Sequence, residues 1–504
     1  MKALIIYPPI QFMDVETPRP DGSLGPLYLV SSLESAGIEA NILDASVGSN
    51  SHDIKDTYFR NVRQENGLTR IGMSFEEIAD YVVANDYNVV GIHSNFTPQT
   101  NMAFETAKAI KSANPHIKIY AGGVNARALK ERFLQTGYFN GICLTEGELI
   151  FPVAILNGVE NAPGWAYINN NGKIKVNPTN GTCFPKSLDD LPMPAWEKLP
   201  FNKYEVIASP HGVDVTERKV SRYGPITTSR GCPFSCDYCH ISDEKSDTSL
   251  TGSIGKLRLH SEERVLKEIS RLKSLDVKKL FFEDDSLLAK KLRVKNIFKE
   301  VIGQGLSISN VNGVNLVHFH QKGKYGLEID KEYLEILRDA GFDQIVFPVE
   351  SGSQRILDKY ATGKNNLTTM NFPLLMKTMT DIGIKAPVNM MIGFPDETED
   401  EMKQSITLAH KLMDSGAPYV TFFIPIPFPG SKLFDIAISG GYLPRDFNTD
   451  VFNWKRPVMQ NTTVAPERVE ELRDIANEQV NTNGHLETRL KQSIGYRWVA
   501  NPSN

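Results

Sequence analysis

The sequence predicts an α/β protein with two successive domains, each built on parallel strands. Three observations support this fold class. Short β-rich runs alternate with amphipathic helical stretches along the first half of the chain, and a second alternating series begins near residue 222. Strands and helices that alternate at this pitch form βαβ units and a parallel sheet. A chain of 504 residues is also too long for a single hydrophobic core.

Composition excludes several functional classes. Hydrophobic residues make up 41% and charged residues 23% of the chain, and the formal net charge is −5. Because there is no sustained basic stripe, we expect no nucleic-acid partner. No stretch reaches the ~20 apolar residues of a membrane span, and Pro8 and Pro9 close the first apolar run too early for a secretory signal. We therefore expect a cytoplasmic protein without a membrane span.

The first predicted domain covers residues 1–185 and is a doubly wound, Rossmann-like sheet. Ser74 and Glu77 form a capping box, so a helix should begin there. Open α/β sheets bind ligands at the carboxyl ends of their strands, which here carry "HSNFTPQT", "AGGVNA" and "LTEGE". The predicted strands cover 2–9, 39–45, 88–94, 117–123 and 141–147, and the other helices cover 25–37, 102–114 and 128–137.

A polar hairpin near 169–181 and a linker over 186–221 separate this domain from a second one over 222–445. Six strand–helix units in succession predict a partial (β/α)6 barrel, whose site should lie at the strand carboxyl ends. Residues 446–504 form a small α-rich region that we expect to act as a lid. The barrel strands are predicted at 225–229, 278–284, 307–313, 344–351, 386–395 and 419–427, and the helices at 262–275, 288–303, 330–340, 368–382, 397–415 and, in the last region, 465–480.

Cys232, Cys236 and Cys239 follow the strand "PITTS" with the spacing CxxxCxxC. In a reducing cytosol such a group binds metal or does chemistry more readily than it forms disulfides. Structural zinc takes four protein ligands, and the fourth would have to be the adjacent His240. Electron-transfer clusters also have four cysteines. Three thiolates suit a [4Fe-4S] cluster with one open iron, although zinc and a purely electron-carrying cluster remain alternatives. The other two cysteines, Cys143 and Cys183, stand alone and are expected to be small buried residues.

The cysteine motif and four later segments resemble the radical S-adenosylmethionine (SAM) enzymes over residues 222–435. These segments are "FFEDDS" (281–286), "FPVESGS" (347–353), "MIGFPDET" (391–398) and "PFPGSKLFD" (427–435). In this sequence Asp396 stands where the family often has glycine, and the acidic second-strand segment replaces a glycine-rich one. Glu350 could equally be a buried carboxylate paired to a lysine, and the acidic run a helix cap. The resemblance implies that the three cysteines hold the catalytic cluster and that the SAM-binding residues are Tyr238, Glu283, Asp284, Asp285, Glu350, Ser351, Gly393 and Phe394.

The first domain resembles the cobalamin-binding domain that precedes such a barrel in the cobalamin-dependent subfamily. Glycine amides and small hydroxyls suit a buried nucleotide tail. The DxHxxG motif that supplies an axial histidine to cobalt is absent, and His93 lacks its Asp and Gly partners. The resemblance therefore implies base-off cobalamin without a histidine ligand. The contact residues that it implies are Ser94, Asn95, Thr97, Gly122, Gly123, Val124, Asn125, Thr145, Glu146 and Gly147.

Together the two resemblances imply a radical SAM C-methyltransferase with a [4Fe-4S] cluster, SAM and cobalamin. A 5′-deoxyadenosyl radical would abstract hydrogen from an unactivated substrate carbon, and methylcobalamin would donate the methyl group. The substrate would be a small molecule or biosynthetic intermediate, and a flavodoxin or ferredoxin would supply electrons. The alternative with the same cofactors is a cyclisation, ring contraction or rearrangement without methyl transfer. A zinc-dependent scaffold and a methylthiotransferase are further alternatives, although no second three-cysteine domain is visible.

Overall fold

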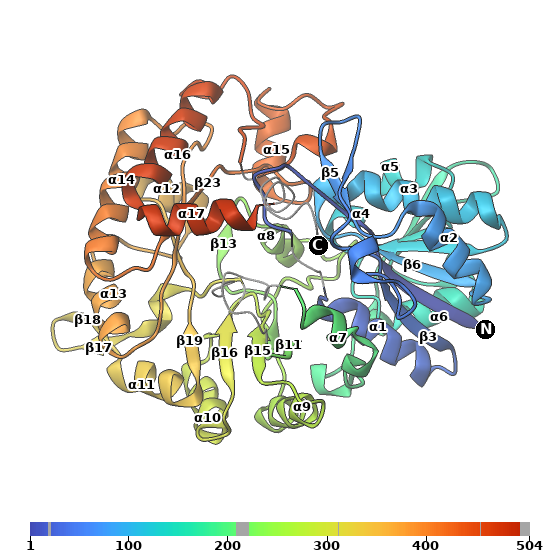
Figure 1. Ribbon diagram of the computed structural model, residues 1–504, viewed down its shortest axis with the longest axis horizontal. Coiled ribbons are helices and arrows are strands. Elements are labelled where there is room, and N and C mark those ends of the chain that lie inside the picture. Colours follow the sequence, from blue (N-terminus) through green and yellow to red (C-terminus); the bar gives the residue numbers. More distant parts are fainter. Residues whose placement is uncertain (19–21, 208–220, 311, 454, 494–504) are drawn as a thin grey trace. The chain divides into compact units, whose positions relative to one another are not determined.

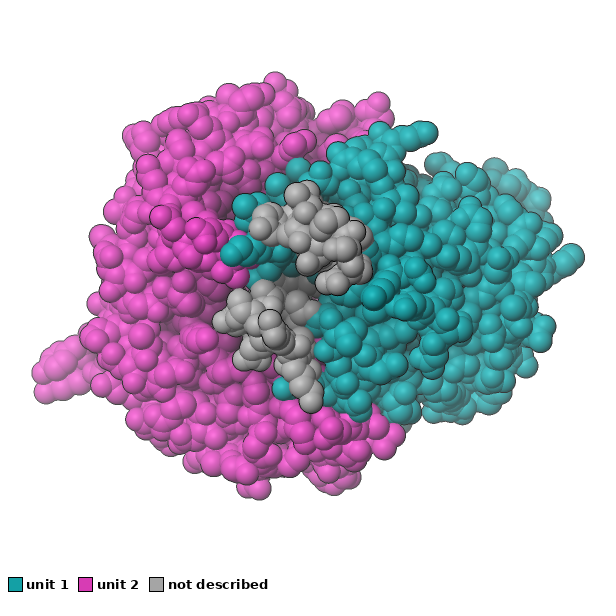
Figure 2. Space-filling model, viewed as in Figure 1, with its two compact units in different colours: residues 1–222, 246–254, 489–504 teal, residues 223–245, 255–488 magenta. Residues whose placement is uncertain are grey.

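The computed structural model describes residues 1–18, 22–207, 221–310, 312–453 and 455–493. Parts of the predicted linker (208–220) and of the predicted C-terminal region (454 and 494–504) lie outside these residues. The described chain divides into two compact units, which are coloured separately in Figure 2. Unit 1 contains Met1–Arg222, Ser246–Ile254 and the chain from Arg489, and unit 2 contains Tyr223–Lys245 and Gly255–Thr488.

Unit 1 is built on a sheet whose strand order, within the described residues, is β10-β9-β8-β7-β6-β1-β3. The strands β3, β1, β6, β7 and β8 are parallel, and the antiparallel hairpin β9–β10 extends the sheet beyond β8. This parallel order is that of a doubly wound fold, as the sequence predicts. The bounds are β1 (Lys2–Tyr7), β3 (Glu39–Asp44), β6 (Val89–His93), β7 (Lys118–Gly122), β8 (Gly141–Cys143), β9 (Trp165–Ile168) and β10 (Ile174–Asn177).

Helices cover both faces of this sheet, and in Figure 1 α2 and α3 lie on one side of it and α1 and α6 on the other. The capping box at the start of α2 is present: Ser74 Oγ accepts from the Glu77 amide, and the Glu77 carboxylate accepts from the Ser74 amide. A small sheet, β2-β5-β4, lies beside these elements. The bounds are α1 (Leu24–Ser35), α2 (Phe75–Ala84), α3 (Thr100–Ala113), α4 (Val124–Ala128), α5 (Lys130–Gln135), α6 (Ile150–Asn157), β2 (Ile10–Phe12), β4 (Val62–Arg63) and β5 (Thr69–Ile71).

Much of the predicted linker packs as part of unit 1. The short helix α7 (Phe201–Tyr204) is fixed by the Lys203 ammonium, which donates to four backbone carbonyls in the segment 47–52 at 2.6–3.2 Å. Tyr204 donates a 2.7 Å hydrogen bond to the Asp44 carboxylate at the end of β3. These buried contacts attach this part of the predicted linker to unit 1, while the predicted domain bound at residue 185 stays a prediction.

Unit 2 is a partial barrel of parallel strands. In the described part of the chain its strands form two runs, β11-β15-β16-β19 and β20-β22-β23, which are joined where Gln344 bridges to Lys385. The fourth barrel strand is therefore interrupted between β19 and β20. The bounds are β11 (Tyr223–Ile226), β15 (Lys279–Phe282), β16 (Ser307–Asn310), β19 (Phe342–Gln344), β20 (Phe347–Glu350), β22 (Val388–Met391) and β23 (Val420–Phe423).

Amphipathic helices lie outside the barrel strands (Figure 1). Helix α16 packs against β23 and α14, so this part of the C-terminal region belongs to the helical layer of unit 2. The lid role of residues 446–504 stays a prediction. The main helices are α9 (Glu262–Ser274), α10 (Lys291–Val301), α11 (Lys331–Ala340), α13 (Phe372–Asp381), α14 (Glu399–Asp414), α16 (Pro466–Val480) and α17 (Asn483–Gln492).

Several short elements were not predicted because they are too short to show a hydrophobic period. The predicted helix 128–137 corresponds to α5, and Leu129, whose φ of −107° and ψ of 27° lie outside the helical region, separates it from the unpredicted helix α4. No helix in the described residues has the length and apolar character needed to cross a bilayer. The unpredicted elements of unit 2 are α8 (His240–Ser246), α12 (Gln354–Tyr360), α15 (Lys432–Ser439), β12 (Ser229–Arg230), β13 (Ser235–Cys236), β14 (Arg258–Leu259), β17 (His320–Gly323), β18 (Gly326–Ile329) and β21 (Ala361–Thr362).

Candidate radical SAM site

The three-cysteine loop follows β11 and leads into α8. Gly231 begins it with a φ of +80°, and a Cβ at this position would lie 2.4 Å from the Lys256 carbonyl oxygen. Only glycine fits both the conformation and the close backbone approach. The Cys232 amide donates to the Gly255 carbonyl at 3.1 Å, and the Cys239 amide donates to the Cys236 carbonyl at 3.1 Å. The backbone of the loop is therefore held at both ends of the motif.

The three thiols are close enough for the charge of one to affect the pKa of another. Burial raises the pKa of Cys236 and of Cys239, and the negative charge of the neighbouring thiolates raises both further. The described residues contain no group of three or more His, Cys, Asp or Glu side chains placed around a single metal ion. In a [4Fe-4S] cluster each thiolate binds a different iron, so the ligands of a cluster need not converge on one point. A soft donor set of three neighbouring thiols fits an iron–sulfur cluster.

The acidic residues after β15 bind the backbone that precedes the cysteines. Asp284, which is 2% exposed, accepts from the Thr228 amide at 2.9 Å, the Thr228 hydroxyl at 2.7 Å and the Ser229 hydroxyl at 2.6 Å. Asp285 accepts from the Gly231 amide at 2.9 Å. Neither carboxylate caps a helix. The structure thus gives Asp284 and Asp285 a role in shaping the loop, and their predicted contact with SAM stays a prediction, as does that of Glu283.

Glu350, the last residue of β20, connects the fourth strand to the cysteine motif. Its carboxylate accepts a 2.9 Å hydrogen bond from the Tyr238 hydroxyl and forms an ion pair with the Lys364 ammonium. Although burial lowers the pKa of Lys364, the charge of Glu350 raises it above its usual value. Glu350 has a φ of +72°, which is uncommon for a residue with a side chain. The pairing to a lysine, one of the two interpretations of Glu350, is therefore present.

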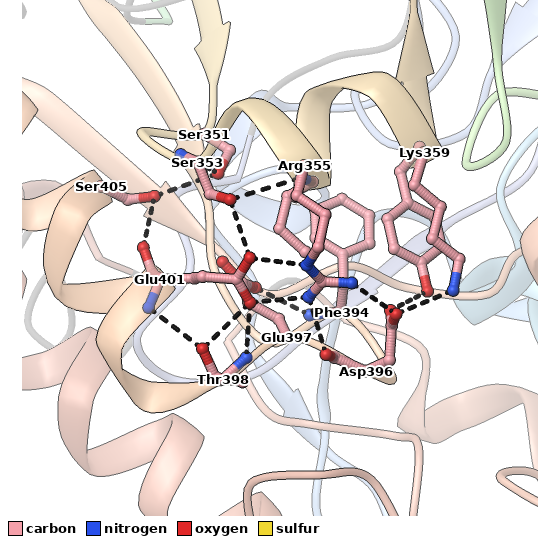
Figure 3. Close-up of polar contacts among 12 residues, drawn as sticks. Ser351, Ser353, Arg355, Lys359, Phe394, Asp396, Glu397, Thr398, Glu401 and Ser405 are labelled. Atoms are coloured by element: carbon pink, nitrogen blue, oxygen red, sulfur yellow. Dashed lines mark hydrogen bonds and ion pairs between the residues drawn. The ribbon is translucent and has the colours of Figure 1, made fainter.

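The segment after β22 turns sharply at Gly393, whose φ is +103°. Buried Glu397 organises this turn, because one of its carboxylate oxygens accepts from the amides of Gly393 at 2.7 Å and Phe394 at 3.0 Å (Figure 3). Burial raises the pKa of Glu397 to about 8. The same close-up shows Ser351, whose hydroxyl lies 3.2 Å from that of Ser405 on α14. The Ser351 hydroxyl thus has a hydrogen-bond partner within the protein.

The structure brings three of the predicted SAM-binding residues together, because Glu350 and Phe394 both contact Tyr238. Its hydroxyl bonds to Glu350, and its ring lies 6.2 Å, between centroids, from the ring of Phe394. Motifs from the first, fourth and fifth barrel strands therefore meet at one place, at the carboxyl ends of the strands. In a barrel of this kind that edge holds the active site.

In unit 1 the three predicted strand-end segments follow β6, β7 and β8, which are neighbours in the sheet. Gly123 has a φ of +103°, and a Cβ there would lie 2.4 Å from Asn95 Oδ1. The Asn125 amide nitrogen donates to the Ser94 hydroxyl at 2.9 Å, while its buried Oδ1 has no partner among the described residues. Thr97 is buried, and the Val124 amide donates to Asn95 Oδ1 at 3.3 Å. Close packing against Asn95 and Ser94 explains Gly123, and the cobalamin contacts of these segments stay predictions.

In the third of these segments, which follows β8, Thr145 and Gly147 contact other parts of unit 1. The Thr145 hydroxyl donates a 2.7 Å hydrogen bond to the Thr251 carbonyl of the segment Ser246–Ile254 in the same unit. A Cβ on Gly147 would lie 2.8 Å from Leu29, so close packing explains this glycine, and Glu146 is a half-buried neighbour. The His93 ring lies edge-on to Tyr7, with its Nε2 3.3 Å from the Ser23 hydroxyl.

Two residues at the barrel site were missed by sequence reasoning. Lys364 lies in a polar loop, and only the need of buried Glu350 for a cation could have indicated it. His318, in the turn η7 (Leu316–Phe319), has a ring 5.8 Å from that of Phe234 in the cysteine loop, between centroids, and a buried Nε2 without a partner in the described chain. Burial lowers the pKa of His318 to about 4. No sequence signal distinguishes it from a surface histidine.

A three-cysteine loop at the mouth of a partial barrel, combined with a doubly wound domain, defines the class of radical SAM enzymes with a corrinoid-type domain. Comparison with known sequences agrees. The sequence profile of the Radical SAM superfamily matches residues 226–409, and that of the B12 binding domain matches residues 22–155. The chain belongs to the cobalamin-dependent radical SAM enzymes, whose cofactors are a [4Fe-4S] cluster, SAM and cobalamin.

The similarity extends over almost the whole chain. An uncharacterised methyltransferase of Pyrococcus horikoshii is 28% identical over 488 residues, 95% of this chain and 90% of the relative. The cytidylyl-2-hydroxyethylphosphonate methyltransferase of Streptomyces wedmorensis is 26% identical, over 88% of this chain and 82% of its own. The radical SAM methyltransferase TsrM of Kitasatospora setae, solved with cobalamin and a [4Fe-4S] cluster, superposes with a TM-score of 0.59 at 15% identity over 88% of this chain and 78% of its own. This structural likeness concerns the fold.

Proposed function

We propose that the chain methylates an unactivated carbon of a small biosynthetic intermediate in the cytoplasm, with electrons from a flavodoxin or ferredoxin. When bound, the cofactors supply a 5′-deoxyadenosyl radical for hydrogen abstraction and a cobalt-bound methyl group for transfer. The observation that carries the proposal is the meeting of Tyr238, Glu350 and Phe394 beside the cysteine loop. It gathers three of the residues proposed to bind SAM next to the thiols proposed to hold the cluster.

The protein's own residues would position the reactants and exclude water. Cys232, Cys236 and Cys239 would hold three irons and leave the fourth for SAM. Asp284 and Asp285 fix the loop that carries these cysteines. The turn at Gly393 and Phe394 would present backbone to the adenine, while Val469 of α16 fills the space that a Gly393 side chain would need. The proposed cobalamin contacts at the ends of β6, β7 and β8 would hold the nucleotide tail.

The test uses protein reconstituted anaerobically with iron, sulfide and hydroxocobalamin. We expect iron and sulfide near four per chain, with both lost in Cys236→Ala and retained in Cys183→Ala. We also expect visible corrinoid absorbance to remain after gel filtration. A protein that binds one zinc and no labile sulfide would refute the cluster, and the absence of retained corrinoid would refute the cobalamin site independently.

Methyl transfer is tested separately with SAM that carries a deuterated methyl group. Mass spectrometry should find the label on cobalamin without substrate. With a candidate substrate it should find the label on the product, together with S-adenosylhomocysteine. If a converted substrate gives 5′-deoxyadenosine and an unmethylated product, the reaction is a cyclisation, ring contraction or rearrangement.

A further inference from the structure

Asp396, two residues after Phe394, binds three side chains of helix α12. Its carboxylate accepts three hydrogen bonds: one of 2.7 Å from the Arg355 guanidinium, one of 2.8 Å from the Lys359 ammonium and one of 2.6 Å from the Tyr360 hydroxyl (Figure 3). The Arg355 guanidinium also donates to the Asp396 backbone carbonyl at 2.9 Å. Glycine, the residue that the family often has here, could make only the last of these contacts. The other three contacts depend on the aspartate side chain.

Each ion pair alone would contribute little, because the side chains of Asp396 and Arg355 are 33% and 47% exposed. Isolated exposed pairs stabilise by about 0–1 kcal/mol. Here, however, three donors from successive turns of one helix converge on one carboxylate, and a network with good geometry is stronger than an isolated pair. Although burial acts in the opposite direction, these donors hold the pKa of Asp396 well below its usual range. The carboxylate is charged throughout the physiological pH range.

One further contact joins helix α12 to the turn after β22, and another joins α12 to α14. The Tyr360 and Phe394 rings stack with centroids 4.4 Å apart and an interplanar angle of 16°. Arg355 also forms a bidentate pair with Glu401 of α14, at 2.6 and 2.7 Å (Figure 3). Arg355 thus lies between two carboxylates, and it fixes the turn with respect to both helices.

The two connected segments are those that the proposed function assigns to SAM. Helix α12 begins directly after the segment Glu350–Ser353, and Asp396 ends the segment that begins at Gly393. The amides of Gly393 and Phe394 donate hydrogen bonds to the Glu397 carboxylate. Asp396 holds the opposite end of the same short turn. A ligand that contacts both segments binds more tightly when they are already in place, since no binding energy is spent on ordering them.

From this arrangement we infer that Asp396 is a positioning residue for SAM. It locks the adenine-facing turn to α12 through three side-chain contacts. The inference rests on the proposed function for the identity of the ligand. The rigid connection itself concerns only residues that the structure describes. It can therefore be tested apart from the ligand.

The experiment compares wild type with Asp396→Gly, Asp396→Asn and the control Glu399→Gln. Glu399 is a partly exposed carboxylate three residues further on, paired with Arg468 and Lys403, and in the described part of the chain no hydrogen bond or ion pair joins its side chain to α12. The dissociation constant of radiolabelled SAM is measured on cluster-loaded protein of equal iron content. Amide hydrogen exchange of residues 393–397 and 355–360 is measured on cluster-free protein.

We expect Asp396→Gly to weaken SAM binding about tenfold, the loss that corresponds to about 1.4 kcal/mol, and to raise exchange in both segments. Asp396→Asn retains an oxygen acceptor, so its dissociation constant for SAM and its amide exchange should lie between those of Asp396→Gly and wild type. Glu399→Gln should bind SAM as wild type does. Unchanged SAM affinity or unchanged exchange in Asp396→Gly would overturn the inference. If wild type itself bound no SAM, the proposed function would fail, and the exchange data would still decide whether Asp396 locks the turn.

Discussion

The Tyr238 hydroxyl donates a 2.9 Å hydrogen bond to Glu350, 112 residues further along the chain. One contact thus joins the cysteine loop to the fourth barrel strand. The same carboxylate pairs with the Lys364 ammonium, and both side chains of that pair are about nine-tenths buried. The ion pair is therefore enclosed by protein, and its integrity should decide the stability of the site.

Replacing Glu350 by Gln should destabilise the cluster-free protein by about 3–5 kcal/mol, because it leaves the buried Lys364 without its counter-charge. The double variant Glu350→Gln/Lys364→Met should recover most of this loss, since the uncompensated charge is removed as well. Tyr238→Phe should cost only about 1 kcal/mol, the value of one hydrogen bond. Urea unfolding measures all three. A Glu350→Gln variant as stable as wild type would contradict the enclosed ion pair.

Asp284→Ala should shorten the lifetime of the reconstituted cluster, because the Thr228 amide and two hydroxyls lose their acceptor next to the cysteine loop. Each buried group left without a partner costs about 1–3 kcal/mol. Asp343→Ala is the control: half-exposed Asp343, in β19, accepts from Lys279, the first residue of β15, at 3.1 Å and from Ser309 at 2.8 Å. The measurement is iron release to a chelator over time. Equal release from both variants would show that Asp284 has no special relation to the cluster.

Gly122→Ala and Gly123→Ala should separate ligand contact from backbone strain in unit 1. A Cβ on Gly122 has its nearest contact at 3.5 Å, from Cys143, so the folded protein should accept alanine there. A Cβ on Gly123 meets Asn95 and the Ser94 carbonyl at 2.4–2.5 Å, and its positive φ costs about 1–2 kcal/mol more. The midpoint temperature of thermal unfolding should therefore be lower than that of wild type only for Gly123→Ala. If cobalamin lies against this turn, Gly122→Ala should also retain less corrinoid after gel filtration, and full retention would place the cobalamin elsewhere.

His318 should make the stability of the protein depend on pH between about 6.5 and 4. Burial lowers its pKa from 6.5 to about 4, so in this range the unfolded chain binds a proton that the folded protein does not. Stability from this group is present above pH 6.5 and is lost as the pH falls through 4. The loss is up to about 3 kcal/mol. The difference in unfolding free energy between wild type and His318→Phe, measured by urea unfolding across this range, should follow that course, and a constant difference would contradict it.

Local signals in the sequence account for most of the secondary structure that was predicted. The capping box of Ser74 and Glu77 begins α2 because both of its hydrogen bonds join residues three apart. The long amphipathic helices α9, α14 and α16 were predicted to within two residues at each end. By contrast, α12 spans Gln354–Tyr360, which is too short for a hydrophobic period, and it begins after Glu350, whose positive φ no residue pattern indicates.

The sequence by itself determined the alternation of strands and helices, the incomplete set of three cysteines and the order of the motifs along the barrel, because these depend on residues close together in the chain. Only the tertiary structure decided what the acidic residues do. Asp284 binds the chain 56 residues before it, Glu350 pairs with Lys364, and Asp396 binds α12. A carboxylate at a strand end can cap a helix, pair with a cation or face a ligand. Its donors come from elements that meet only when the barrel closes, so the choice among these roles is made by folding.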